Sequence, residues 1–184
     1  VLARTALRLR ASHSFSPPLR DYIATMAKIY IALGTNLGDR LANLRTAITS
    51  LAPDVRVLRE STIYKTPPWG YTDQPSFLNM VIEAETSLNP RALLAYLKKR
   101  EDELGRVKNF RYGPRHIDLD ILFYDDLVLN EEHLQIPHPR LHERAFVLVP
   151  LADLTSDLVH PLLQEDIGTL LKGLNSDEIS PFSV

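Results

Sequence analysis

The sequence predicts an α+β fold, in which an antiparallel sheet carries helices on its outer face. Three observations predict it: short apolar runs of strand length, two longer segments with apolar residues three and four apart, and proline- and glycine-rich stretches between them. The 184 residues are 45% hydrophobic and 24% charged, which is typical of a globular protein with one core. We therefore expect a single folded domain over residues 26–184.

The first predicted strand is the apolar run KIYIAL at Lys28–Leu33, which the turn GTNLGDR follows at once. In that turn Asp39 has the side chain of a helix N-cap. Apolar residues then recur at helical spacing until Pro53 ends the pattern. These residues are Leu41, Leu44, Ile48 and Leu51. The segment is predicted to be an amphipathic helix that packs on the sheet.

Two further strands and a second helix follow. Val55–Tyr64 and Asn79–Glu85 have the composition of extended chain, and the proline-rich stretch TPPWGYTDQP between them is predicted to be a loop. Pro90–Leu104 has helical spacing, with proline at its start and Gly105 just past its end.

The strongest strand signal is DLDILFY at Asp118–Tyr124. After it we expect a small hairpin at Val128–Ile136 and helices at Phe146–Leu154 and Ile167–Leu174. The order strand, helix, strand, strand, helix, strand is the split βαβ arrangement of a ferredoxin-like βαββαβ sandwich. That fold carries many functions and selects none of them.

Composition excludes several classes of protein. The net charge of −2 lacks the positive field of a nucleic-acid-binding protein, and no RNP1-like run is present. The absence of cysteine excludes disulfides, thiolate zinc sites and cysteine nucleophiles. No apolar run reaches the ~20 residues of a membrane-spanning helix. We expect a monomer in the cytoplasm that acts on small molecules, with no nucleic-acid or membrane partner.

Residues 1–25 differ from the rest of the chain. Four arginines and several serines stand against one acid, Asp21, which is the composition of an organelle transit peptide. The alternative is an unstructured extension, because Met26 directly precedes the first strand. We expect residues 1–25 to be a disordered or targeting-like extension.

The candidate chemistry centres on Asp118 and Asp120, which are two residues apart in a strand and so share one face, with Cα atoms roughly 6.6 Å apart. Neighbouring carboxylates resist joint ionisation unless a cation compensates, and oxygen ligands suit Mg²⁺. The alternative is that one aspartate ends the strand in solvent while the other pairs with Arg115. Just upstream, Arg106, Lys108, Arg111 and Arg115 fall within ten residues. They form either a solvated basic loop or the cationic half of a phosphoryl-transfer site.

Two other patterns concern ligands. In TPPWGYTDQPSFLN the residues Thr66, Trp69, Phe77 and Asn79 offer aromatic faces and hydrogen-bonding groups suited to a flat heteroaromatic ring, and ordinary loop packing is the alternative. His138 and His142 have helical spacing, but Pro139 lies between them and HExxH is missing, so a zinc pair is not favoured. GTNLGDR matches no standard phosphate loop and is interpreted as a turn.

The segment RYGPRHIDLDIL resembles the signature of the hydroxymethyldihydropterin pyrophosphokinases. ALGTNLGDR, YKTPPWG, DQPSFLN, ELGRV and IPHPRLHERAFVLVPL stand in the order and spacing of that family, over roughly Lys28 to Leu174. The resemblance implies a ferredoxin-like fold, ATP as co-substrate, two Mg²⁺ ions, and transfer of the β and γ phosphates of ATP to 6-hydroxymethyl-7,8-dihydropterin in folate synthesis. The proton acceptor is left open between Asp120 and a metal-bound hydroxide.

The resemblance also implies roles for individual residues. The metal ligands would be Asp118 and Asp120, with Arg106 and Arg115 as catalytic cations. The ATP site would comprise Lys98, Glu101, Lys108, Tyr112, Arg115, Ile121, His138 and Arg144. The pterin site would comprise Thr66, Pro67, Pro68, Trp69, Phe77, Asn79 and Phe146. Departures from familiar members are Lys98 for glutamine, Lys108 for arginine, Tyr112 for tryptophan and Pro139 for tyrosine. A lysine at position 108 gives up bidentate phosphate binding.

Two other functions stay open at this point. One is a different two-metal nucleotidyl or phosphoryl transferase, because the carboxylates do not select the acceptor and the 66–79 segment does. The other is an RNA-binding module, since ferredoxin-like sheets with exposed aromatic residues stack bases. Acids stand on the strand where such aromatic residues would be needed, and this disfavours the second reading.

Overall fold

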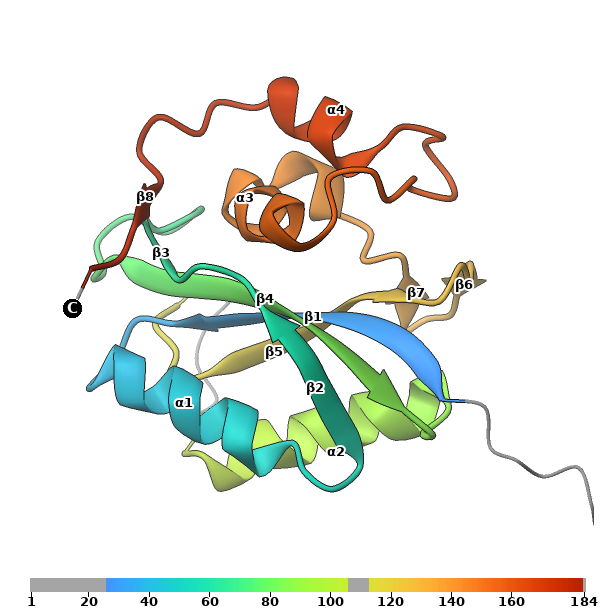
Figure 1. Ribbon diagram of the computed structural model, residues 1–184. Coiled ribbons are helices and arrows are strands. Elements are labelled where there is room, and N and C mark those ends of the chain that lie inside the picture. The colour runs from blue at the N-terminus through green and yellow to red at the C-terminus, as the bar shows by residue number, and fades with distance from the viewer. Residues whose placement is uncertain (1–25, 106–112, 184) are drawn as a thin grey trace, which may run out of the picture.

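The computed structural model describes residues 26–105 and 113–183, which form an α+β fold built on an antiparallel sheet, as predicted (Figure 1). The strands are β1 (Ala27–Thr35), β2 (Val55–Glu60), β3 (Tyr64–Thr66), β4 (Phe77–Thr86), β5 (Asp118–Tyr124), β6 (Leu129–Asn130), β7 (Gln135–Ile136) and β8 (Ser180–Pro181). The helices are α1 (Arg40–Ser50), α2 (Pro90–Glu103), the 3₁₀ helix η1 (Leu141–Glu143), α3 (Ala145–Leu154) and α4 (Ile167–Lys172).

The main sheet has the strand order β5-β1-β4-β3-β8, and β2 pairs with the same edge of β4 as β3 does. Strand β1 lies between β5 and β4 and pairs with β4 from Ala27 opposite Thr86 to Thr35 opposite Leu78. On its other side β1 pairs with β5, where Gly34 stands opposite Asp118. Because β1 lies between these two strands, its carboxyl end meets both the carboxylate strand β5 and the start of β4.

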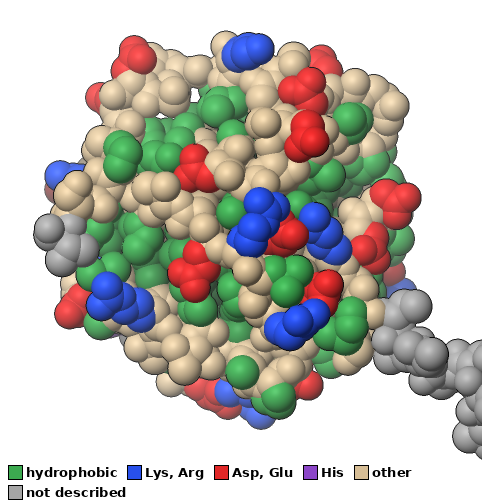
Figure 2. All heavy atoms as spheres, viewed as in Figure 1, with side chains coloured by type: hydrophobic (Ala, Val, Ile, Leu, Met, Phe, Trp, Pro, Cys, Tyr) green, Lys and Arg blue, Asp and Glu red, His purple; other side chains and the backbone are tan. Residues whose placement is uncertain are grey.

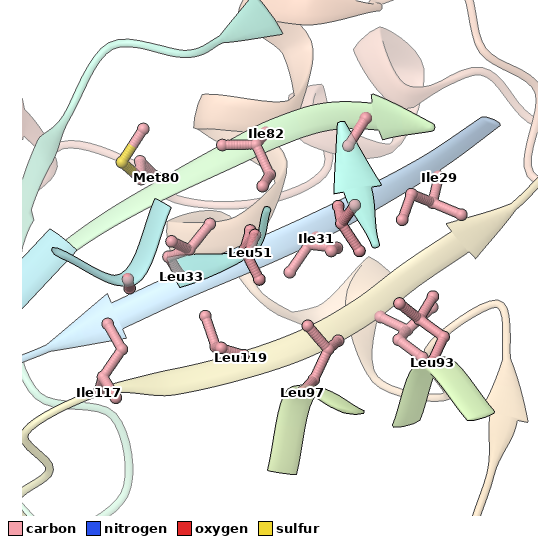
Figure 3. Close-up of a cluster of buried hydrophobic side chains, with 14 of the residues drawn as sticks. Ile29, Ile31, Leu33, Leu51, Met80, Ile82, Leu93, Leu97, Ile117 and Leu119 are labelled. Carbon is pink, nitrogen blue, oxygen red and sulfur yellow. The ribbon is translucent and has the colours of Figure 1, made fainter. Parts of the chain in front are cut away.

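Helices α1 and α2 cover one face of the sheet (Figure 1). Their starts follow the expected chemistry: Asp39 accepts the backbone N–H of Ala42, and Asn89 accepts that of Ala92 just before a proline at the first helical position. The apolar stripes of both helices meet alternate residues of β1, β4 and β5 (Figure 3). This cluster includes Ile29, Ile31, Leu33, Met80, Ile82, Leu93, Leu97 and Leu119.

The opposite face of the sheet carries a second apolar layer, which α3 and α4 provide (Figure 1). Tyr30 and Leu122 point to this side and pack with Leu148 and Leu151 of α3. Helices therefore lie on both faces, and the second layer brings α3 and η1 close to the face on which Asp118 and Asp120 stand.

The predicted extended segment 55–64 divides into two strands. At Ser61 the chain leaves the ladder: the Ser61 hydroxyl accepts the N–H of Val81, at an Oγ to N distance of 2.9 Å, and the Ser61 N–H binds the Val81 carbonyl. Pairing with β4 resumes in β3, where Tyr64 stands opposite Asn79. The short strand β8 was not predicted from the sequence, because a two-residue pairing with Tyr64 and Lys65 has no hydrophobic alternation of its own.

Two surface features bear on partners. No helix in the described parts of the chain combines the length and apolar character needed to cross a membrane. On the face seen in Figure 2, basic and acidic side chains lie interleaved among the described residues, without a broad basic patch. Charged side chains are paired across strands β2 and β4, namely Arg59 with Glu83 and Arg56 with Glu85.

Candidate active site

A cavity of about 230 Å³ opens where the ends of β1, β4 and β5 face α3. It brings together two groups of residues that lie far apart in the sequence. The charged group comprises Lys98, Arg115, Asp118, Asp120 and Arg144. The aromatic and amide group comprises Thr66, Pro67, Trp69, Phe77, Asn79 and Phe146. One cavity therefore contains both the ionic and the aromatic half of the site that the sequence predicts.

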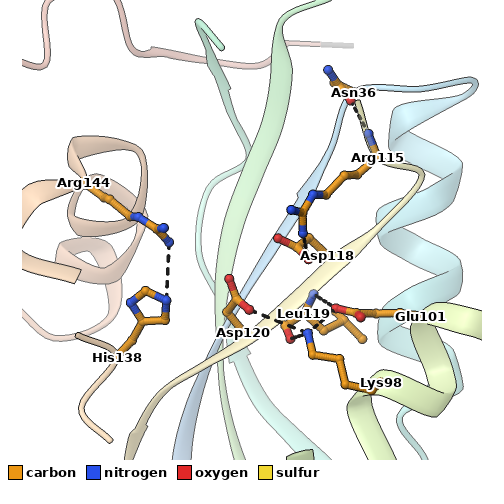
Figure 4. Close-up of polar contacts among 9 residues, drawn as sticks. All are labelled: Asn36, Lys98, Glu101, Arg115, Asp118, Leu119, Asp120, His138 and Arg144. Atoms are coloured by element: carbon orange, nitrogen blue, oxygen red, sulfur yellow. Dashed lines mark hydrogen bonds and ion pairs between the residues drawn. The ribbon is translucent and has the colours of Figure 1, made fainter. Parts of the chain in front are cut away.

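Strand β5 presents both carboxylates to this cavity, since Asp118 and Asp120 share a face while Leu119 between them is fully buried on the other (Figure 4). Each carboxylate faces a cation. Oδ1 of Asp118 lies 2.6 Å from Nη1 of Arg115, and Oδ1 of Asp120 lies 3.8 Å from Nζ of Lys98. The cations offset the repulsion between two adjacent negative charges in a half-buried position.

The peptide group of Leu119 is held by helix α2. Strand β5 is at one end of the sheet order, so the outward N–H and C=O of Leu119 have no neighbouring strand. Glu101 Oε1 accepts the Leu119 N–H at 2.6 Å, and Nζ of Lys98 donates to the Leu119 carbonyl at 3.2 Å and to Glu101 at 2.8 Å. The Glu101 side chain is fully buried. These contacts fix the backbone of β5 at Leu119, between the two carboxylates.

We expect Glu101→Ala to lower the free energy of unfolding by about 2–4 kcal/mol, because it leaves the Leu119 N–H unsatisfied and removes the carboxylate partner of Lys98. The matched control is Glu103→Ala on the same helix, whose exposed carboxylate pairs with Lys99 and Arg100. That change should cost about 0.5 kcal/mol or less. Urea unfolding of both variants measures the difference, and equal losses would contradict the anchoring role of Glu101.

His138 and Arg144 face Asp118 and Asp120 from the opposite side of the site (Figure 4). Nε2 of His138 lies 3.5 Å from Nη1 of Arg144, and Nδ1 accepts the backbone N–H of Arg140 at 3.2 Å. Burial lowers the pKa of His138 below its ordinary value, and the Arg144 charge acts in the same direction while Asp120 and Asp118 act against it. Arg144 therefore supplies the cation on this side of the site, next to the His138 ring.

The aromatic half of the site is built on the pairing of β1, β3 and β4. Asn79 Nδ2 donates to Thr66 Oγ1 at 2.7 Å, and both side chains are buried. Gly34 stands opposite Asn79 on β1. A Cβ atom at Gly34 would lie 2.6 Å from Oδ1 of Asn79. Only glycine leaves the Asn79 amide in this orientation at the wall of the cavity.

Phe77 and Phe146 line the same cavity from β4 and α3. The Trp69 ring lies 6.4 Å from the ring of Phe146, at an interplanar angle of 57°. With the Asn79 amide, these rings provide flat apolar surfaces and a hydrogen-bonding edge. This combination suits a planar heterocycle.

Asn36 is a residue of the site that the sequence reasoning missed. It is 2% exposed, and its Oδ1 accepts the Arg115 N–H at 2.8 Å while its own N–H binds the Arg115 carbonyl at 3.0 Å. Its Nδ2 donates to Gln74 Oε1 and the Pro75 carbonyl. Asn36 thereby ties Arg115 to the loop 67–76, which joins β3 to β4. No pattern in the GTNLGDR segment marks Asn36, because its partners are distant in the sequence.

The other predicted residues are distributed as follows. Glu101, Ile121 and His138 adjoin the carboxylates without lining the cavity, and Pro68 lines a second cavity beside the first. Arg106, Lys108 and Tyr112, like residues 1–25, lie outside the described residues. The roles given to all of these residues stay predictions. Within the described part of the chain, the helix start predicted at Asp39 is confirmed.

The donor set in the cavity is compatible with Mg²⁺. Among residues 26–105 and 113–183 no cluster of three or more histidine or acidic side chains has metal-binding geometry. Two aspartates are thus the available carboxylate ligands. Mg²⁺ commonly takes one or two carboxylates and completes its shell with substrate phosphates and water. The pair Asp118 and Asp120 fits this pattern and does not fit a closed site made of protein ligands alone.

Comparison with known proteins decides which family this site represents. The model of the 7,8-dihydro-6-hydroxymethylpterin-pyrophosphokinase (HPPK) family matches residues 30–156, which contain both halves of the cavity. The chain belongs to the HPPK family. The match ends within the loop after α3, so α4 and β8 lie outside the part that the HPPK model describes.

Two relatives are similar to the chain over most of its length. It is 41% identical over 142 residues to a 2-amino-4-hydroxy-6-hydroxymethyldihydropteridine pyrophosphokinase of Aquifex aeolicus, covering 77% of this chain and 89% of that protein. It is 45% identical over 154 residues to the folic acid synthesis protein fol1 of Pneumocystis carinii, covering 83% of this chain. The chain spans about a fifth of the Pneumocystis protein, since the match covers 21% of it.

A solved structure agrees with the fold. An HPPK-DHPS chain of Plasmodium falciparum superposes with a TM-score of 0.69 at 16% identity, and the match covers 83% of this chain and 46% of that one. At this identity the likeness supports the HPPK fold and carries no conclusion about individual residues.

Proposed function

We propose that this chain transfers a diphosphate group from ATP to the hydroxyl group of 6-hydroxymethyl-7,8-dihydropterin, giving AMP and the pterin diphosphate in folate synthesis. The observation that carries the proposal is the single cavity in which the Asp118 and Asp120 carboxylates face the amide of Asn79 and the rings of Phe77 and Phe146. Membership of the HPPK family and the similarity to the Aquifex pyrophosphokinase support the same reaction.

In this proposal the pterin ring stacks between Phe77 and Phe146. The Asn79 amide reads its hydrogen-bonding edge together with backbone groups around Thr66 and Pro68. Asn79 is suited to this because its Nδ2 is already committed to Thr66, so its carbonyl oxygen is presented in one orientation. The aromatic walls exclude water from the hydroxymethyl group, which lies toward the carboxylates.

The triphosphate of ATP then lies between two groups of side chains. Arg115 and Lys98 come from one side, and Arg144 and His138 from the other, around the carboxylates. Fixed cations neutralise charge on the phosphate oxygens as it redistributes in transfer, which is the main protein contribution in phosphoryl transfer. The predicted cations Arg106 and Lys108 belong to the same proposal.

The chemical step forms a bond between the pterin alcohol oxygen and the β-phosphorus, and breaks the bond between that phosphorus and the oxygen bridging to the α-phosphate. The bridging oxygen leaves with AMP, and the alcohol proton passes to a base. Asp120, whose carboxylate lies 3.8 Å from Nζ of Lys98, is one candidate for that base, and a hydroxide on the metal would be the other. Two Mg²⁺ ions held by Asp118 and Asp120 would supply charge neutralisation at the phosphates.

The proposal also covers the type of sheet, the extent of the domain, and the oligomeric state and location. The sheet is of the ferredoxin-like type, which the order β5-β1-β4-β2 and the placement of α1 and α2 on one face support. Residues 26–184 form one catalytic domain. Action as a monomer in the cytoplasm stays a prediction.

The proposed reaction is tested by incubating the protein with ATP, Mg²⁺ and 6-hydroxymethyl-7,8-dihydropterin and separating the nucleotides. We expect AMP to form in amounts equal to the pterin diphosphate, and only when the pterin is present. Formation of ADP would indicate transfer of a single phosphate, and AMP without dependence on the pterin would indicate a different acceptor. Either result contradicts the proposal.

A further inference from the structure

Trp69 lies at the partition between two cavities. It lines the cavity of the candidate active site and also a second cavity of about 770 Å³, whose far wall is the C-terminal segment 174–179. Thr66, Pro67 and Phe146 are shared by the two linings in the same way. A side chain between two hollows has room to leave its position, so Trp69 requires specific contacts to stay at the wall of the active site.

Two guanidinium groups provide such contacts. The Arg140 guanidinium carbon lies 4.4 Å from the centroid of the Trp69 ring, and that of Arg144 lies 5.5 Å from the same ring and 5.7 Å from the ring of Phe146. Both arginines flank the short helix η1. A planar guanidinium stacked on indole combines charge attraction with surface contact, and tryptophan is the strongest aromatic partner.

Arg140 is held in place independently of Trp69. Its Nε donates to Oε2 of Glu143 one turn further along, at 3.0 Å, and its backbone N–H donates to Nδ1 of His138. The Arg140 side chain is 34% exposed. The stack therefore connects the 67–76 loop to a segment that is already fixed beside the carboxylates.

We propose that Arg140 is a positioning residue of the acceptor site: by stacking on Trp69 it holds the 67–76 loop at the cavity wall and so sets the affinity for the pterin. This inference rests on the proposed function. Arg144 contacts the same ring, but its predicted role toward ATP means that its replacement changes several steps together. Arg140 lines neither cavity, so its replacement removes the stack and the ion pair with Glu143 without changing a cavity wall.

The stack can be measured directly, because Trp69 is the only tryptophan of the chain. In Arg140→Gln without substrates, we expect the Trp69 emission to be quenched by acrylamide about twice as efficiently as in the unmodified protein. The KM for the pterin should rise about fivefold, the change expected when a partly exposed cation–π contact is lost. The kcat should stay within about twofold, because Arg140 touches no reacting atom.

Two further variants separate the effect of the Arg140 charge from that of the planar stack and provide a control. Arg140→Lys keeps the charge but loses the planar stack, so both the quenching and the KM should fall between the values of the unmodified protein and of Arg140→Gln. Arg91→Gln is the matched control: Arg91 is an exposed arginine paired with Glu131 and lines neither cavity. It should leave quenching, KM and kcat unchanged.

Three outcomes would overturn the inference: quenching and KM of Arg140→Gln equal to those of Arg91→Gln, easier quenching without a rise in KM, or a fall in kcat at constant KM. Far-UV circular dichroism confirms that each variant is folded. Failure of the proposed function is read separately, as the absence of pterin-dependent AMP from the unmodified protein. The quenching comparison does not depend on that activity.

Discussion

Replacing Asp118 or Asp120 by alanine should lower the kcat for AMP formation by a factor on the order of 10³ at saturating Mg²⁺, with the fold retained. The two carboxylates are the available acidic metal ligands in the described part of the cavity, so neither has a substitute. Each is about one-quarter to one-third exposed, with side-chain values of 23% and 34%, so neither is required by the core. The loss should therefore appear in kcat and not in stability.

The matched control is Asp126→Ala, which removes an exposed carboxylate from the turn that follows the same strand. It should leave kcat within about twofold, as expected for an exposed residue outside the cavity. Thermal unfolding of all three variants checks that they are folded. Near-normal turnover of Asp118→Ala or Asp120→Ala at saturating Mg²⁺ would show that the two-metal assignment is wrong.

Replacing Gly34 by alanine should raise the KM for the pterin at least tenfold, an effect on the order of losing one buried polar recognition group. The new Cβ would lie 2.6 Å from Oδ1 of Asn79. Asn79 cannot yield easily, because its amide nitrogen is bound to Thr66 in a buried position. The methyl group on β1 would therefore displace the Asn79 amide, which is the group proposed to bind the pterin edge.

A double-mutant cycle identifies this mechanism. If Gly34→Ala acts through Asn79, adding it to Asn79→Ala should raise KM by less than about twofold, since the displaced group is already absent. Gly168→Ala is the control, because a Cβ there would meet its nearest atoms at 3.4 Å, an ordinary contact. Full additivity of the two changes would indicate that Gly34→Ala disturbs the sheet and not Asn79.

Much of the fold was predictable because the periodicity of the apolar residues matches the elements closely. The predicted strand Asp118–Tyr124 has the bounds of β5, and the predicted helix Pro90–Leu104 differs from α2 by one residue. The second helical layer on the opposite face was not part of the predicted arrangement. Helix α3 is apolar on nearly all sides, and such a segment does not indicate which face of a sheet it covers.

The candidate site was predictable where a residue type and its spacing carry the chemistry, as with two aspartates on one face of a strand. Asn36, Gly34 and Arg140 were missed for a common reason. Each acts through a contact with a residue that is distant in sequence: Arg115 for Asn36, Asn79 for Gly34 and Trp69 for Arg140. No local pattern records such a partnership, because it arises only when the strands and loops come together.

The hydrogen bonds from α2 to Leu119 also oppose pairing of β5 with a strand of another molecule. The carboxylates stand on a strand at the rim of the sheet, where a long substrate can approach from solvent. Such a rim strand exposes backbone groups that invite pairing with another chain. Glu101 and Lys98 occupy the outward N–H and C=O of Leu119, between the two aspartates. The two side chains that fix the carboxylates thus also block pairing of β5 with another strand at Leu119, while the cavity face of the strand stays accessible.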